Sequence, residues 1–129
     1  MVIRVMMLMV LLFVNNANAN AFFLDKQKTF IFVSFSMSDE ALKTYFAESQ
    51  KAGAQLIMRG LINNSFTQTK NKTMELGISF DIDPCLFEQY KIDVVPVIVI
   101  DDKKRGLTKK LTGHIPLAIA IEIMNENTQ

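Results

Sequence analysis

The sequence is poor in the residues that most often carry chemistry in proteins. Its 129 residues include one cysteine, Cys85, and one histidine, His114. A single cysteine cannot form a disulfide within the chain, and one cysteine with one histidine is too few for a Cys/His metal cluster. No serine stands in a G-x-S-x-G motif, and the chain has no glycine-rich phosphate-binding loop. We therefore expect no metal, no cofactor and no catalytic residue.

An excess of charge of one sign is also missing. The chain has 14 basic and 13 acidic residues, and Arg4 is the one charged residue among the first 19. The remainder is therefore close to neutral. A neutral domain has no electrostatic attraction to nucleic acid or to an anionic membrane surface, so neither is expected as a partner.

The N-terminal residues have the order of a secretory signal peptide. Arg4 is followed by an apolar run over residues 5–14 and then by small residues at alternate positions, among them Ala19 and Ala21. The run is about half of the roughly 20 apolar residues that span a bilayer. We expect cleavage after Ala19, or alternatively after Ala21, and no membrane span thereafter. An uncleaved membrane anchor is the other interpretation.

The first half of the remaining chain alternates between strand and helix patterns. Residues 29–35 form a continuous apolar run, which is typical of a central strand covered on both faces. Ser38 is a candidate N-cap for a helix that ends at Gly53. Residues 54–58 then predict a second strand.

The middle of the chain has weaker patterns. Asn63–Ser65 predict a turn, and a polar helix is expected over residues 66–75. Residues 77–82 alternate as a short or edge strand does. Asp83 and Pro84 then form a helix start, with an acidic cap and proline at the first helical position.

The last segment predicts a hairpin and a helix. Residues 94–100 form a strand pattern with Pro96 at its start, where a missing N–H is tolerated. A polar turn over residues 101–106 leads to a return strand over residues 107–111. Pro116 marks the start of the final helix.

The complete element order is β-α-β-α-(β)-α-β-β-α. This order predicts an α/β fold of the thioredoxin-like type, with a central mixed sheet and helices on both faces. Pro96 falls where that fold has its cis-proline. The expected division is a signal peptide over residues 1–19, an N-terminal extension over 20–28 and one domain over 29–127.

The position that carries the redox cysteines in thioredoxin-like enzymes has no thiol. Between the first strand and the first helix the chain reads Ser36-Met37-Ser38-Asp39, which excludes dithiol chemistry. Cys85 has no resolving cysteine, and we interpret it as a small, partly buried helix residue. The alternative is a single-cysteine thiol enzyme, or an isomerase-like protein, that uses Cys85.

Arg59 and Gly60 end the second predicted strand. An arginine at the end of a buried strand is either part of a structural salt bridge or an exposed anchor for a partner, and both interpretations remain open. Gly60 is expected to adopt a positive φ in a turn.

Four segments resemble the F-type TrbC family in their order and spacing. They are Phe32–Ser38, Leu56–Leu61, Ile82–Pro84 followed by Phe87, and Val95-Pro96. The similarity extends from about residue 30 to residue 100.

The resemblance implies a periplasmic protein of a type IV secretion system that helps to assemble a conjugative pilus. It implies a thioredoxin-like fold without redox cysteines, and partners that include a TraW-like periplasmic protein and other pilus assembly components. It supplies no catalytic residues. The candidate partner contacts or structural motif residues are Arg59, Gly60, Asp83, Pro84, Val95 and Pro96. The resulting hypothesis is a non-catalytic assembly factor that acts by protein binding; the alternatives are a Cys85 thiol enzyme and a general envelope chaperone.

Overall fold

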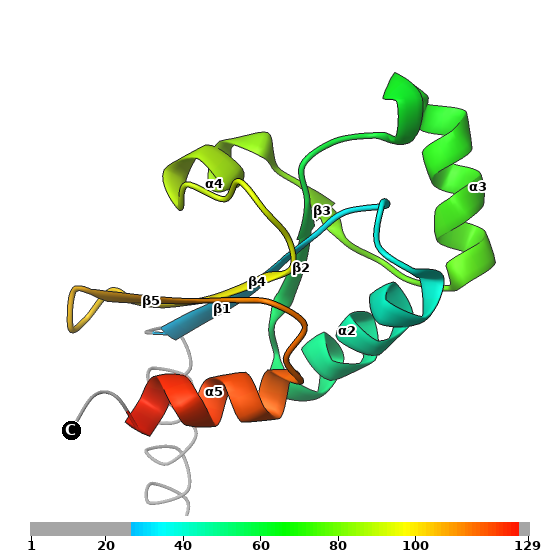
Figure 1. The fold of residues 1–129 in the computed structure, drawn as a ribbon. Helices are drawn as coiled ribbons and strands as arrows, with labels where there is room; N and C mark the ends of the chain where they lie inside the picture. The colour runs from blue at the N-terminus through cyan, green and yellow to red at the C-terminus, as the bar shows by residue number, and fades with distance from the viewer. Residues whose placement is uncertain (1–26, 127–129) are drawn as a thin grey trace, which may run out of the picture.

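The computed structural model describes residues 27–126, which form one five-stranded sheet with helices on both faces (Figure 1). The strands are β1 (Gln27–Val33), β2 (Gln55–Met58), β3 (Asp81–Ile82), β4 (Val97–Asp102) and β5 (Leu107–Thr112). The helices are α2 (Asp39–Ala52), the short 3-10 helix η1 (Ile62–Asn64), α3 (Phe66–Leu76), α4 (Pro84–Gln89) and α5 (Leu117–Glu126). The predicted signal peptide lies outside the described residues.

The sheet is mixed, as the element order predicts. Its strand order is β3-β2-β1-β4-β5. β1 pairs in parallel with β2, which pairs in parallel with β3, whereas β4 is antiparallel to both β1 and β5. Because β1 has a partner on each side, its residue Ile31 lies opposite Leu56 on β2 and Ile98 on β4.

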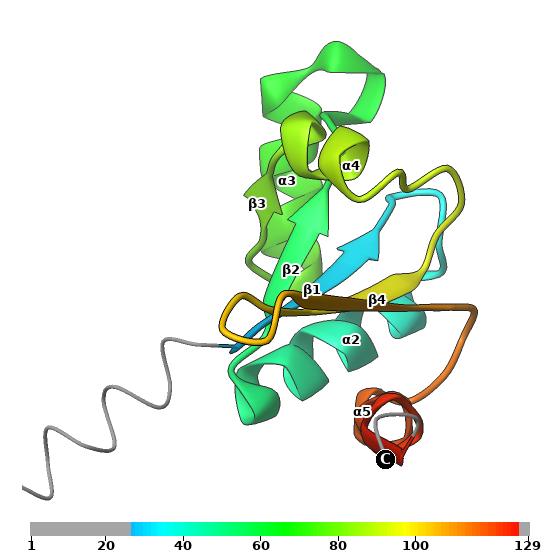
Figure 2. The ribbon, with the colours of Figure 1, turned by 90° about the vertical axis from the view of Figure 1, so that its left-hand side faces the viewer.

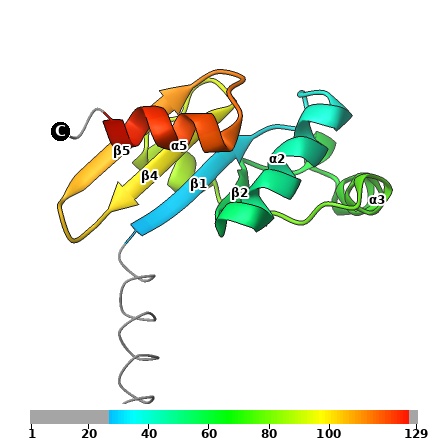
Figure 3. The ribbon, with the colours of Figure 1, turned by 90° about the horizontal axis from the view of Figure 1, so that it is seen from below.

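The helices divide into two layers. α2 and α5 cover one face of the sheet with α3 beside them (Figure 3), and α4 covers the other face (Figure 2). Successive strand residues point to opposite faces, so Ile31 and Val33 pack under α2 and α5 while Phe30 and Phe32 pack under α4. The continuous apolar run of β1 thus follows from burial on both faces.

The predicted helix ends are confirmed. The Ser38 hydroxyl accepts a hydrogen bond from the Ala41 N–H at 3.2 Å, and Gly53 ends α2 with φ of 67°. At α4, the Asp83 carboxylate accepts a hydrogen bond from the Leu86 N–H at 3.1 Å, and Pro84 occupies the first turn. These helix boundaries depend on local interactions within a few residues.

The strand ends differ from the predictions because pairing determines them. β1 begins two residues earlier than expected, since Gln27 and Lys28 pair with Asp102 and Asp101 on β4. The same pairing extends β4 beyond the predicted start of the hairpin turn. The predicted strand over residues 77–82 is reduced to β3, a two-residue edge strand.

The polar helix α3 forms at the edge of the molecule. Only Thr69 and Leu76 of its residues are buried, which explains its weak amphipathic pattern. Lys72 forms an ion pair with Asp39 at 3.0 Å and so connects α3 to the first turn of α2. None of the helices within residues 27–126 combines the length and the apolar character needed to cross a bilayer.

Candidate functional site

An open groove of about 800 Å³ lies at the end of the sheet where β1 and β2 finish and β4 begins. Figure 2 shows the loop after β1 and the loop before β4 at this same end. Three loops form its walls: the first is residues 34–36, the second is residues 93–95 and the third is residues 59–63. Its floor consists of buried side chains, namely Val33, Met58, Phe87 and Ile92.

The first wall is the thiol-free loop that follows β1. The Ser34 and Ser36 hydroxyls hydrogen-bond to each other at 2.9 Å, and the Ser36 N–H donates to the Ser34 hydroxyl at 3.2 Å. A turn closes the loop where the Met37 N–H donates to the Ser34 carbonyl at 3.1 Å. Within residues 27–126, the hydrogen-bond partners of these two serines include no histidine and no carboxylate, the side chains that commonly activate a serine nucleophile.

The second wall precedes β4 and contains the cis peptide bond Val95-Pro96. Pro96 is buried, and its carbonyl accepts a hydrogen bond from the Gly113 N–H at 3.0 Å. Val94 and Val95 both line the groove, and Val94 is 61% exposed. The cis-proline therefore stands where the sequence pattern places it, next to the thiol-free loop.

The third wall follows β2 and begins with Arg59. Arg59 is exposed, and its guanidinium carbon lies 5.4 Å from the centroid of the Phe87 ring. No carboxylate within residues 27–126 forms an ion pair with it, so the structure shows no salt bridge of the kind considered from sequence.

The expected positive φ at Gly60 is wrong. The left-handed residues of this loop are instead Asn63 and Asn64, with φ of 50° and 54°. Asparagine tolerates this conformation because its short side chain hydrogen-bonds locally.

Asp83, Pro84 and Cys85 begin α4 and do not line the groove. The Asp83 N–H donates to the Met58 carbonyl at 3.0 Å, which holds the start of α4 against β2. Cys85 is exposed, so the prediction of a partly buried residue is wrong. Phe87 is the buried residue of α4, and helical geometry directs a side chain two positions earlier away from the face that Phe87 occupies.

A polar cluster under α4 lies apart from the groove. The Tyr90 hydroxyl donates a hydrogen bond of 2.5 Å to the Asp101 carboxylate, and the Tyr90 ring packs against Phe30 and Phe32. Burial of the hydroxyl, together with the hydrogen bond to Asp101 and its negative charge, raises the pKa of Tyr90 to about 12. Tyr90 is therefore neutral at physiological pH and has a structural role.

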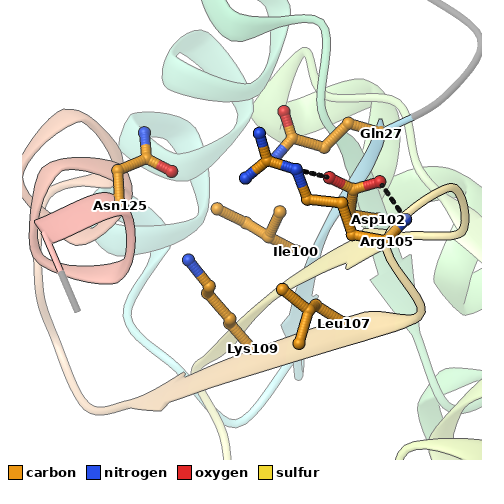
Figure 4. Close-up of a pocket in the computed structure, with 7 residues that line it drawn as sticks. All are labelled: Gln27, Ile100, Asp102, Arg105, Leu107, Lys109 and Asn125. Atoms are coloured by element: carbon orange, nitrogen blue, oxygen red, sulfur yellow. Dashed lines mark hydrogen bonds and ion pairs between the residues drawn. The ribbon is translucent and has the colours of Figure 1, made fainter. Parts of the chain in front are cut away.

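A second hollow of about 280 Å³ lies at the opposite end of the sheet, between β5 and the end of α5 (Figure 4). Arg105 forms an ion pair with Asp102 across the hairpin turn at 3.8 Å, and the Lys109 ammonium donates a hydrogen bond to the Met124 carbonyl, so the charged side chains here have partners. Within residues 27–126, no three His, Cys, Asp or Glu side chains are grouped to hold a metal ion. The groove is therefore the candidate functional site, and its exposed side chains and peptide groups suit binding.

Comparison with known proteins identifies the family. Residues 31–122 match the family described as "Type-F conjugative transfer system pilin assembly protein". This chain belongs to that family. The match includes all three walls of the groove, and it confirms the resemblance found in the sequence motifs.

A curated relative supports the same assignment. The Periplasmic protein TrbC of Escherichia coli strain K12 is 35% identical over 82 residues, which cover 58% of this chain and 38% of the relative. The chain therefore matches little more than a third of that protein's length.

Solved structures of low sequence identity confirm the thioredoxin-like fold. StoA from Bacillus subtilis has a TM-score of 0.56 at 14% identity, covering 75% of this chain and 81% of the other. The exposed lipoprotein thioredoxin Etrx1 from Streptococcus pneumoniae has a TM-score of 0.56 at 17% identity, covering 78% and 84%. At this identity the likeness concerns the fold alone.

Sequence analysis found part of this groove and missed the rest. Of the candidate residues, Arg59, Gly60 and Val95 line it, and Pro96 is buried next to Val95 in the chain. Val94 was missed because it belongs to the apolar run over residues 94–100 that predicts the following strand. Asp93 precedes that run, and no pattern in the sequence marked it. The predicted strand start at residue 94 is wrong, since β4 begins at Val97. The signal available in the sequence was Pro96, which has no N–H to donate to a neighbouring strand.

Proposed function

We propose that this protein is a non-catalytic periplasmic assembly factor of a type-F conjugative pilus and that it acts by binding another protein. The family's description supports pilin assembly, and the curated relative supports a periplasmic location. The observation that carries the proposal is the groove itself, which stays open beside the cis-proline while its first wall has no thiol.

Thiol chemistry needs more than this site contains. Disulfide exchange requires an attacking thiolate and, for turnover, a second thiol that releases the mixed disulfide. The chain has one cysteine, and it lies on α4 outside the groove. A binding role requires only the exposed surface.

The second candidate function is a single-cysteine thiol enzyme. It is favoured by one observation, the exposure of Cys85 in the first turn of α4. An exposed thiol can reach the disulfide of another protein, and its thiolate form can attack that disulfide to give a mixed disulfide. The replacement Cys85→Ser separates the two candidates because it removes the sulfur and keeps a small polar side chain.

A pull-down from donor cells tests the proposal. The tagged protein is retrieved from the periplasm of a conjugating donor, with and without reductant, as wild type and as Cys85→Ser. We expect a small set of transfer proteins, including a TraW-like protein, in all four samples, and normal transfer by the variant. Clients that are released by reductant and lost in Cys85→Ser would establish the thiol enzyme instead. Many unrelated clients would indicate a general chaperone.

Export by a cleaved signal peptide is part of the same proposal. N-terminal sequencing of protein recovered from the periplasm is expected to begin at Asn20 after cleavage at Ala19, or at Phe22 after cleavage at Ala21. Recovery of the intact N-terminus in the membrane fraction would establish the uncleaved anchor.

A further inference from the structure

Arg59 presents an unpaired positive charge at a defined place in the groove. Its guanidinium lies over Phe87, which is only 3% exposed and packs edge-on against Phe32 with ring centroids 4.9 Å apart. The ring beneath Arg59 is therefore held by the core. A guanidinium over a fixed ring is restrained, and it keeps its donors free for an acceptor in the groove.

The opposite wall presents unpaired peptide groups. Asp93, Val94 and Val95 line the groove, and no hydrogen bond within residues 27–126 involves their N–H groups. Exposed peptide groups of this kind are suited to pairing with the backbone of another chain. The exposed Val94 side chain adds an apolar contact beside them.

The charges of the groove favour one position for an acid. Arg59 and Asp93 are the charged residues that line it. A carboxylate near Asp93 would be repelled, whereas at Arg59 it forms a charge-assisted and potentially bidentate pair. The groove is therefore complementary to a chain that places an acidic side chain on the Arg59 wall.

We propose that the groove binds an extended segment of a partner protein through an aspartate or glutamate that pairs with Arg59. The peptide groups of the segment pair with those of residues 93–95, and an apolar side chain of the segment packs against Val94. This inference rests on the proposed function, that the protein acts by binding, and it names the chemical class of the ligand.

A peptide array tests the acid requirement on the unmodified protein. The probes are overlapping short peptides that cover the periplasmic proteins encoded by the same conjugative element. A duplicate array carries Asn and Gln in place of every Asp and Glu. The protein, recovered from cells that express the full chain, is expected to bind acidic peptides and to bind their neutral copies about tenfold more weakly. Equal binding to both arrays, or binding to none, would overturn the proposal.

Variants of the protein test whether the acidic side chain of the peptide pairs with Arg59. Arg59→Gln is expected to weaken binding of the selected peptides about tenfold, and Arg59→Lys to weaken it less. The matched control is Lys43→Gln, which removes one exposed positive charge from α2 outside the groove and should bind as wild type does. Asp93→Asn should bind at least as well as wild type. Equal weakening by Lys43→Gln and Arg59→Gln would show that peptide binding depends on the net charge of the protein. That result would overturn the assignment of the acid to Arg59.

The periplasmic pull-down distinguishes this inference from the proposed function. If Arg59→Gln retains the transfer proteins as the wild type does, the Arg59 contact is wrong while the assembly role stands. If the wild type itself retains none, the proposed function fails.

Discussion

At the residue scale, the backbone conformation of two glycines gives a direct test of the structure. Gly53 ends α2 with φ of 67°, whereas Gly60 lies outside the left-handed region. A Cβ built on either glycine would meet no atom within 4 Å. The two positions therefore differ in backbone conformation and share open surroundings.

Gly53→Ala is expected to lower the free energy of unfolding by about 1 kcal/mol, because a left-handed alanine is strained. Gly60→Ala should leave it unchanged or raise it by up to about 1 kcal/mol, because alanine restricts the unfolded chain. Urea unfolding of both variants measures the difference. Equal losses would contradict the assigned dihedral angles.

The hydrogen bond between Tyr90 and Asp101 predicts an alkaline titration. Burial and Asp101 raise the pKa of Tyr90 from 10.0 to about 12, so the folded state favours the neutral phenol. The stability that this provides is complete below pH 10 and is lost as the pH rises from 10 to about 12. In a Tyr45→Phe background Tyr90 is the one remaining tyrosine. Its ultraviolet titration should have a midpoint near 12.

Asp101→Asn is the matched variant for this titration. It removes the negative charge that opposes ionisation of Tyr90, so the pKa of Tyr90 should fall toward its ordinary value. An unchanged midpoint would show that burial alone is responsible, and a midpoint near 10 in the parent would contradict the contact.

At the scale of elements, α4 packs against the sheet mainly through one buried aromatic side chain, while the Asp83 N–H bonds its start to the Met58 carbonyl of β2. Phe87 is the buried residue of this six-residue helix, and it packs against Phe32. The same ring lies under Arg59, so the position of α4 and the shape of the groove depend on each other.

Phe87→Ala is expected to lower the free energy of unfolding by about 3–5 kcal/mol, because it leaves a cavity in the core. The matched control is Phe66→Ala on α3, where the side chain is 73% exposed; its effect should stay within about 0.5 kcal/mol. Chemical denaturation compares the two. A small loss in Phe87→Ala would show that α4 is not packed as described.

At the scale of the whole molecule, the two cores share one sheet. Tyr45 belongs to the core under α2 and α5, and Tyr90 packs against the core under α4. The strand β1 contributes to both cores through alternate residues, so neither face can lose its packing without disturbing the other. One cooperative unfolding transition follows.

This cooperativity can be measured because the chain has two tyrosines and no tryptophan. Tyr90→Phe leaves a fluorophore in one core, and Tyr45→Phe leaves one in the other. In each variant, tyrosine fluorescence and far-ultraviolet circular dichroism should give the same unfolding midpoint. Separate midpoints in either variant would show that the two faces unfold independently.

The features predicted correctly from the sequence are those that depend on neighbouring residues. The caps at Ser38 and Asp83 and the helix end at Gly53 were all predicted correctly. The absence of a C-x-x-C motif is likewise a property of the sequence. Each of these involves only a few consecutive residues, so local rules suffice to recognise it.

The features that depend on distant residues follow only from the packing of the folded chain. The pairing of β1 with β4 sets the ends of both strands, and the packing of Phe87 leaves Cys85 exposed and gives Arg59 its support. The groove joins loops that are far apart in the chain. Contacts of this kind have no local signal, because they arise only when the sheet brings those loops together.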